Sequence, residues 1–164
     1  MLSTKAVGSE IPMQFDLTQM VERGHRIFLN DGLVELEVGK VEEDKIICVA
    51  KNDGWVTSNK GVNIPDTHFS KDIFTSKDRE DVNFAIKEKA EYVALSFIQN
   101  PDEVIKIKKY IRDKGGMAKV CVKVEKKEAV DNIEEIVRVA DAVMIARGDL
   151  AIETSESSVP VLQQ

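Results

Sequence analysis

Long apolar segments are absent from this sequence of 164 residues, and no run approaches the roughly 20 residues that a membrane-spanning helix requires. The two cysteines, Cys48 and Cys121, lie in strand-like runs without the paired spacing of a zinc site or a CxxC redox motif. The two histidines, His25 and His68, lie in polar, loop-like surroundings without recognisable catalytic partners. We therefore expect buried, inert thiols and no chemistry centred on histidine.

Runs of positive charge are also absent. The chain has 23 Lys and Arg against 29 Asp and Glu, which gives a net charge of −6. This balance argues against a nucleic-acid or anionic-membrane partner, whereas a small phosphorylated ligand would need only a local basic site. The first residues do not have the basic, apolar and small-residue order of a signal peptide. We therefore expect a cytoplasmic protein.

Strand-like segments dominate the first part of the chain. Residues 26–29 and 33–38 flank Asn30-Asp31-Gly32, and Asp-Gly between two such runs is typical of a hairpin. Residues 45–50 form the next apolar run, and Asn52-Asp53-Gly54 supplies another turn. Short strands separated by turns predict a small all-β barrel or sandwich over residues 1–62.

Beyond Pro65 the pattern changes to α/β. Apolar strands start at residues 92, 118 and 142, and the segments between them have helical periodicity. Asn100-Pro101 has the residue types that begin a helix. One strand and one helix fit each interval, so residues 63–164 predict parallel strands in part of a (β/α)₈ barrel or a doubly wound sheet.

Polar residues follow each of these strands. Ser96 follows the first, Lys123 and Glu125 end the second, and Arg147-Gly148-Asp149 follows the third. This favours the (β/α)₈ barrel, in which functional groups gather at the carboxyl ends of successive strands. The carboxylates suit Mg²⁺ or Mn²⁺, and the ammonium suits a phosphoryl group in transfer. Alternatively, Lys-x-Glu is a solvated pair, Arg-Gly-Asp is a capped turn, and Ser96 is a buried hydroxyl.

Five ordered motifs resemble the pyruvate kinase family. Residues 144–150, Met-Ile-Ala-Arg-Gly-Asp-Leu, are similar to its signature after the sixth barrel strand, and Lys123-Val-Glu125 to its Lys-Ile-Glu element. Residues 94–98 are similar to its fourth strand, residues 60–65 to the return hinge of its lid, and residues 30–33 to its lid hairpin. These motifs cover nearly the whole chain.

The resemblance implies a β-barrel lid over residues 1–62 and the central part of a (β/α)₈ (TIM) barrel over residues 63–164. It implies a glycolytic enzyme that transfers phosphoryl from phosphoenolpyruvate to ADP, giving pyruvate and ATP. Glu125 and Asp149 would bind Mg²⁺ or Mn²⁺, and Lys123 would stabilise the transferring phosphoryl. The substrate would contact Ser96, Phe97, Lys123, Ala146, Arg147 and Gly148, and the nucleotide would contact Asp31 and Lys60. Family members are usually homotetramers.

The sequence also departs from the family pattern. The strands that carry the family's K⁺ ligands and substrate arginine do not precede Met1, and the last two barrel strands do not follow Gln164. Lys126 stands where the family usually has asparagine, and Ala151 where it usually has glycine. Three parallel strands leave two unpaired sheet edges. We therefore expect the 164-residue chain to have negligible phosphotransferase activity by itself.

Two other functions are compatible with the same residues. One is a noncatalytic module that binds a metal or a nucleotide, which the missing substrate and K⁺ groups favour. The other is a Mg²⁺-dependent lyase of the phosphoenolpyruvate/pyruvate type, which can also use carboxylates at strand ends. The β lid between hinges argues against the lyase.

Overall fold

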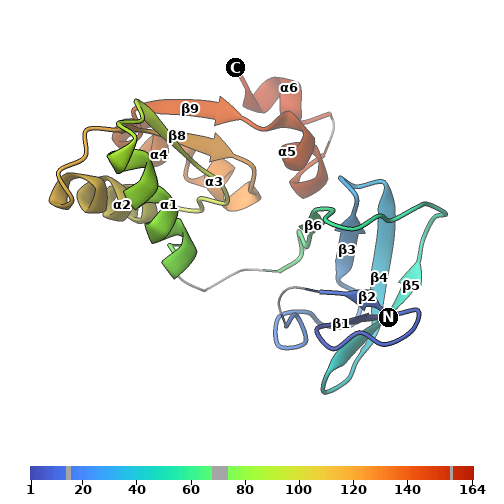
Figure 1. Cartoon of the computed structure of the whole chain (residues 1–164). Coiled ribbons are helices and arrows are strands. Elements are labelled where there is room, and N and C mark those ends of the chain that lie inside the picture. The colour runs from blue at the N-terminus through green and yellow to red at the C-terminus, as the bar shows by residue number, and fades with distance from the viewer. Residues whose placement is uncertain (14–15, 68–73, 156) are drawn as a thin grey trace. The chain divides into compact units, whose positions relative to one another are not determined.

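The computed structural model describes residues 1–13, 16–67, 74–155 and 157–164 (Figure 1). The chain divides into two compact units, Met1–Ser70 and Lys71–Gln164. The boundary predicted between residues 62 and 63 falls inside strand β6 (Val62–Asn63). This strand pairs with Phe28 and Leu29 in the first unit, which explains why the first unit extends further along the chain.

The first unit contains one sheet with the strand order β2-β1-β5-β4-β3-β6. Neighbouring strands pair antiparallel except β1 and β2, which are parallel. Within the described ranges, no pairing joins β2 to β6, so these strands form an open sheet, and the β-barrel lid that the resemblance implied stays a prediction. Besides β6, the strands are β1 (Leu2–Ser3), β2 (Ile11–Pro12), β3 (Arg26–Leu29), β4 (Val34–Val41) and β5 (Lys45–Ala50).

The predicted hairpin at Asn30-Asp31-Gly32 is confirmed. It joins β3 to β4, and Leu29 pairs with Val34 across it. The three turn residues have φ angles of 54°, 58° and 84°, a left-handed conformation that Asn, Asp and Gly tolerate better than other residues. Alternate residues of β4 are buried in the core of this unit with residues from β1, β3 and β5; the fully buried side chains are Leu2, Ile27, Leu29, Val38 and Ile46.

The second unit contains three parallel strands in the order β7-β8-β9, as the sequence predicted. They are β7 (Tyr92–Leu95), β8 (Lys119–Val124) and β9 (Ala142–Ile145). The unit is therefore α/β, but these three strands do not themselves form a (β/α)₈ barrel. Alternate residues of β8 are buried, whereas Cys121 and Lys123 on the other face are half-buried.

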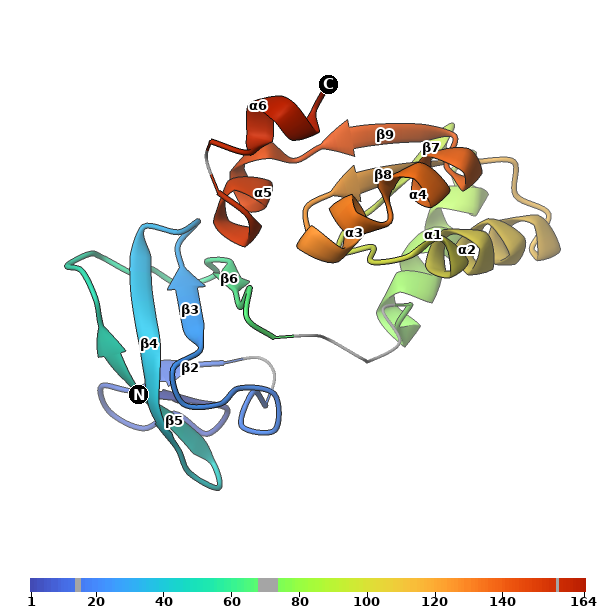
Figure 2. The ribbon, with the colours of Figure 1, turned by 180° about the vertical axis from the view of Figure 1, so that it is seen from behind.

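Helices cover the buried face of this sheet (Figures 1 and 2). Helix α2 packs against β8 and α4, and α1 packs against α2. The core that they share contains Val104, Ile107, Ile111, Val120, Val122 and Ile136. The helices are α1 (Ser76–Lys87), α2 (Pro101–Asp113), α3 (Lys127–Asp131) and α4 (Ile133–Val139). None of the helices in the described part of the chain is long and apolar enough to cross a membrane.

Local sequence signals explain where these helices begin and end. Thr75 with Asp78 and Asn100 with Glu103 form capping boxes at the starts of α1 and α2. The single helix predicted between the strands that start at residues 118 and 142 is divided into α3 and α4. The division is at Asn132, whose side-chain amide donates to the carbonyl oxygens of Gln99 and Glu128.

Two short helices, α5 (Arg147–Glu153) and α6 (Val159–Leu162), follow the carboxyl end of β9 (Figure 2). Leu150 of α5 is fully buried and Val159 of α6 is buried. The two helices also contact each other. The Arg-Gly-Asp segment therefore forms the first turn of α5.

Candidate active site

Glu125, directly after β8, is the centre of the candidate site. Its side chain is only 3% exposed. One carboxylate oxygen, Oε2, accepts a hydrogen bond of 3.0 Å from the backbone amide of Phe97, and the other, Oε1, contacts Nζ of Lys123. A buried carboxylate is costly unless such partners compensate its charge. The local structure therefore fixes the orientation of the Glu125 carboxylate.

Lys123 joins Glu125 to the neighbouring strand. Its Nζ donates to Oγ of Ser96 over 3.1 Å, and its side chain is 30% exposed. Leu95 pairs with Val122, so Ser96 follows β7 beside Lys123. The two residues of the Lys-x-Glu motif point to the same side of the strand, as the two-residue period of a β-strand requires. Residues from two strand ends thus meet in one polar cluster.

Phe97 has an unusual backbone. Its φ angle is 60°, in the left-handed region that bulky residues rarely adopt. This conformation accompanies the hydrogen bond from its amide to Glu125, while the residue is 54% exposed. Strained backbone of this kind is concentrated at functional sites. No local sequence signal predicts this conformation, because an aromatic residue after an apolar strand has no local reason to be left-handed.

The Arg147-Gly148-Asp149 segment begins next to Glu125. Val124 pairs with Ile145, and the amide of Ala146 donates to the carbonyl of Val124 over 3.1 Å. Arg147 and Gly148 are exposed, whereas Ala146 and Asp149 are half-buried. Apart from its chain neighbours and the backbone of its own helix, a Cβ atom added to Gly148 would have no atom within 4 Å, so this position faces open space.

Asp31 and Lys60 belong to the first unit. The amide of Asn30 donates to the carbonyl of Gly61 over 3.2 Å, and a Cβ added to Gly61 would lie 3.6 Å from Oδ1 of Asp31. The hairpin and the segment that carries Lys60 are therefore neighbours, and both side chains are exposed. Their assignment to a nucleotide stays a prediction.

A second charged pair, which no sequence motif predicted, lies beside the site. Lys126 follows Glu125, and its Nζ lies 2.9 Å from Oε1 of Glu153 in α5. The two side chains are 8% and 2% exposed. The departure from asparagine at position 126 was the available signal, but the sequence alone did not indicate a partner.

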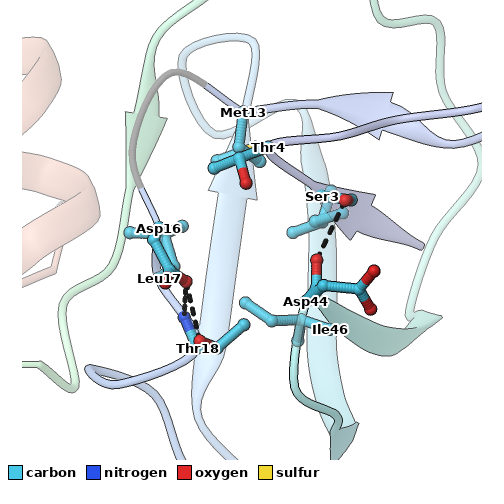
Figure 3. A pocket seen from close by; sticks show the side chains of 9 residues that line it. Ser3, Thr4, Met13, Asp16, Leu17, Thr18, Asp44 and Ile46 are labelled. Carbon is cyan, nitrogen blue, oxygen red and sulfur yellow. Dashed lines mark hydrogen bonds between the residues drawn. The ribbon is translucent and has the colours of Figure 1, made fainter.

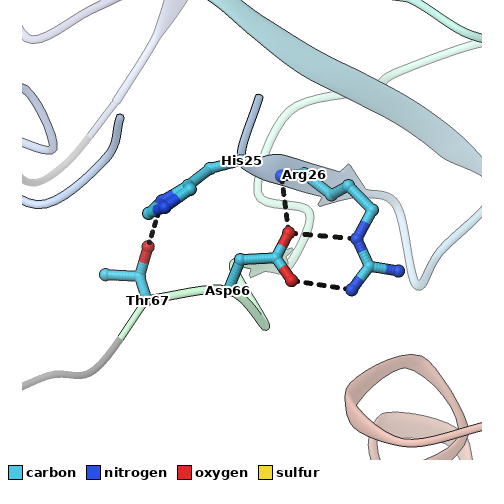
Figure 4. Close-up of polar contacts among 4 residues, drawn as sticks. All are labelled: His25, Arg26, Asp66 and Thr67. Carbon is cyan, nitrogen blue, oxygen red and sulfur yellow. Dashed lines mark hydrogen bonds and ion pairs between the residues drawn. The ribbon is translucent and has the colours of Figure 1, made fainter. Parts of the chain in front are cut away.

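Polar clusters elsewhere differ from this site. In the second unit, Lys108 pairs with Asp141, which precedes β9, and so lies near the amino ends of the strands. The hydrogen bond from Lys108, then that from the amide of Val120, holds the pKa of Asp141 below its usual value. In the first unit, Arg26 donates to Asp66, and Nδ1 of His25 lies 3.3 Å from Oγ1 of Thr67 (Figure 4).

A pocket in the first unit contains none of the candidate residues (Figure 3). Its polar groups are bonded locally: Ser3 donates to the carbonyl of Asp44, and Thr18 donates to Asp16. The two cysteines are free and half-buried, less buried than expected. Burial raises the pKa of the Cys48 thiol, which disfavours the reactive thiolate.

The candidate carboxylates suit a divalent cation only if water and substrate oxygens supply the remaining ligands. Among residues 1–13, 16–67, 74–155 and 157–164, no group of three or more His, Cys, Asp or Glu could hold a metal. Mg²⁺ is commonly bound through one or two carboxylates, with waters and substrate oxygens in the other positions. Two carboxylates would suit that mode and would not suit an all-protein metal cage, and the binding of a metal by Glu125 and Asp149 stays a prediction.

The fold and the site define an α/β protein whose charged candidate residues follow successive parallel strands, where ligands of such sheets bind. A family model described as pyruvate kinase, barrel domain, matches residues 3–164. The chain belongs to the pyruvate kinase family.

Curated relatives give the same result. The chain is 39% identical to a pyruvate kinase of Clostridium acetobutylicum over 150 residues, which are 91% of this chain and 32% of the relative. It is 37% identical to a pyruvate kinase of Thermococcus litoralis, over 94% of this chain and 33% of the relative. It is also 37% identical to one of Methanocaldococcus jannaschii, over 96% and 35%. The chain thus spans about a third of the length of these relatives.

Proposed function

We propose that this chain takes part in the pyruvate kinase reaction, the transfer of phosphoryl from phosphoenolpyruvate to ADP. The observation that carries the proposal is the cluster in which Lys123 contacts both Ser96 and Glu125. Family membership supports the reaction, and the cluster supports the place where it occurs. An ammonium beside an oriented carboxylate is suited to a phosphoryl group next to a metal.

Each residue has a distinct part in this proposal. Lys123 supplies positive charge to the phosphoryl group, and the Ser96 hydroxyl orients the ammonium. Glu125 and Asp149 would hold Mg²⁺ or Mn²⁺, which when bound supplies positive charge to phosphoryl and carboxylate oxygens. The Phe97 amide fixes the Glu125 carboxylate before any ligand arrives. The substrate carboxylate would lie against the backbone of Ala146, Arg147 and Gly148, where no Cβ obstructs it at Gly148.

The nucleotide and the setting complete the proposal. Asp31 and Lys60 would contact ADP from the first unit, where they lie on neighbouring segments. The enzyme would act in glycolysis in the cytoplasm. Neither the nucleotide contacts nor the cellular setting depends on the Lys123 cluster, so either assignment can be wrong while the proposal for the cluster holds.

Binding of Mn²⁺ and phosphoenolpyruvate, measured by calorimetry on the 164-residue chain, tests the site. We expect Glu125→Gln to abolish Mn²⁺ binding. We expect Lys123→Met to retain Mn²⁺ binding but to weaken phosphoenolpyruvate binding, because the ammonium contacts the phosphoryl group and not the metal.

The second unit offers matched controls for both changes. Lys108 and Asp141 form a lysine–carboxylate pair near the amino ends of the strands. Lys108→Met and Asp141→Asn should leave both affinities unchanged. Equal losses in the control variants would show that binding depends on the stability of the unit and would contradict the site. Metal binding without any effect of phosphoenolpyruvate would favour a noncatalytic metal-binding module.

A further inference from the structure

The carboxyl end of β8 carries two charged residues in succession, and their side chains make different contacts. Glu125 contacts Phe97 and Lys123 in the candidate site. Lys126 has extended backbone angles, φ −106° and ψ 150°, so its side chain leaves the chain on the opposite side. There it pairs with Glu153 of α5. One strand end is thus joined both to the candidate site and to the helix that follows β9.

The Lys126–Glu153 pair is enclosed by the protein. Its side chains are 8% and 2% exposed, and the Nζ–Oε1 distance is 2.9 Å. Removing two charges from water is costly, and well-packed apolar residues often stabilise a fold as well as such a pair does. Stability alone therefore does not explain why charged residues occupy these two positions. A charged pair does provide a fixed geometry between the two elements that it joins.

Helix α5 requires such a connection. It has seven residues, and its N-cap residue, Ala146, makes no side-chain capping bond. Isolated helices of this length are not stable in water. Glu153 lies in the last turn, where the helix dipole disfavours a negative charge. The ammonium of Lys126 compensates that charge, and the buried Leu150 supplies apolar contact.

Asp149 and Glu153 lie one helical turn apart in α5, on the same face. Fixing Glu153 against Lys126 therefore also fixes Asp149 relative to Glu125, the residue before Lys126. We propose that Lys126 and Glu153 form a positioning pair that sets the separation of the Asp149 and Glu125 carboxylates. This inference rests on the proposed function, because it assumes that these two carboxylates bind the divalent metal.

The first test measures the Mn²⁺ affinity of the 164-residue chain. Glu125→Gln defines the background, and only the Mn²⁺ binding that this variant lacks is attributed to the site. The double variant Lys126→Met/Glu153→Leu replaces the pair by apolar residues. Its Mn²⁺ affinity should fall about tenfold or more, the usual effect of losing a residue that orients a metal ligand. Lys109→Met/Asp113→Leu removes an exposed pair within α2 and should leave the affinity unchanged.

Amide hydrogen exchange provides a readout that needs no metal. The amide of Leu150 donates to Ala146 and that of Thr154 donates to Leu150, so both report on the opening of α5. Both amides should exchange faster in the Lys126/Glu153 double variant, while amides of β4 in the first unit should not change. The Lys109/Asp113 control should behave as the unsubstituted chain.

The outcomes separate this inference from the proposed function. If the unsubstituted chain binds Mn²⁺ and the double variant binds equally well, the positioning role is wrong, whether or not exchange changes. If the unsubstituted chain does not bind Mn²⁺, the proposed metal site is wrong. If, in addition, the α5 amides exchange equally fast in the double variant and the unsubstituted chain, the pair does not anchor α5 either.

A milder variant covers the case in which the double variant does not fold. Glu153→Asp keeps the charge but shortens the side chain by one methylene, so α5 must move or the pair must lengthen. It should weaken Mn²⁺ binding and speed α5 exchange, each to a smaller extent. Unchanged values for both would contradict the inference.

Discussion

The two units differ in whether their buried polar side chains carry charge. In the described part of the first unit, the buried polar residues are Ser3, Asn63 and Thr67, which carry no charge. In the second unit, they are Glu125, Lys126 and Glu153, which are all ionisable. Burying an ionised group is costly, and the first unit shows that this chain can form a core without doing so. The second unit therefore differs from the first in burying charged side chains, and it does so at the place of the proposed site.

The largest expected effect comes from breaking the buried pair on one side only. Glu153→Leu leaves the Lys126 ammonium buried without this partner, which typically costs about 3–5 kcal/mol of unfolding free energy. Urea denaturation followed by amide exchange should show the loss in β8 amides and no change in β4 amides. A loss in both units alike would contradict the view that the buried charges matter to the second unit alone.

The two units also differ in the space around one glycine in each, Gly54 and Gly148. A Cβ on Gly54 in the first unit would collide with Cγ2 of the buried Val34, so Gly54→Ala should cost about 1–3 kcal/mol through overpacking. Gly148→Ala in the second unit has open space and replaces glycine within α5, so it should stabilise the helix by about 0.5–1 kcal/mol.

The same pair of variants tests the ligand site. Gly148→Ala should weaken phosphoenolpyruvate binding despite the gain in stability, because its methyl group occupies the space where the anion approaches the backbone. Gly54→Ala is the control and should not change binding. Thermal denaturation and calorimetry on the same samples separate the two effects. Unimpaired binding by Gly148→Ala would remove this backbone from the substrate site.

The pH dependence of the second unit depends on Asp141. Because the pKa of this carboxyl is lowered, the ionised form stabilises the fold above the ordinary carboxyl pKa of about 4, and this contribution is lost as the pH falls below it. Asp141→Asn should cost about 1 kcal/mol at neutral pH, since the pair is partly exposed. The difference from the unsubstituted chain should shrink in acid. A difference that persists at low pH would contradict the ionic origin.

Sequence patterns predicted the secondary structure more completely than the site. The Asn30 hairpin, the helix start at Asn100 and the order of the parallel strands depend on local residue types and periodicity, and all are confirmed. The division at Asn132 depends on a side-chain bond to Gln99, a distant residue that periodicity does not report. Tertiary contacts also decide whether the strands of the first unit close into a barrel.

The site shows the same limit. Two-residue periodicity was enough to place Lys123 and Glu125 on one side of the chain, and the structure shows that Ser96, also a candidate from the sequence, bonds to Lys123. The left-handed Phe97 depends on a hydrogen bond to a residue one strand away. The partner of Lys126 lies in a helix after the next strand. Contacts between elements determine both features, so no local motif contains them.

The smallest expected effect concerns the exposed pair of the first unit. The Arg26 side chain donates two hydrogen bonds to the Asp66 carboxylate. This side-chain bonding is the main cause of the lowered pKa of Asp66. Their side chains are 48% and 30% exposed, so water already solvates both charges. Asp66→Asn should therefore cost less than about 1 kcal/mol, and added salt should reduce the difference further. Urea denaturation monitored through β4 amides at low and high salt measures it. A cost as large as that of Glu153→Leu would show that burial does not decide what a charged pair contributes in this chain.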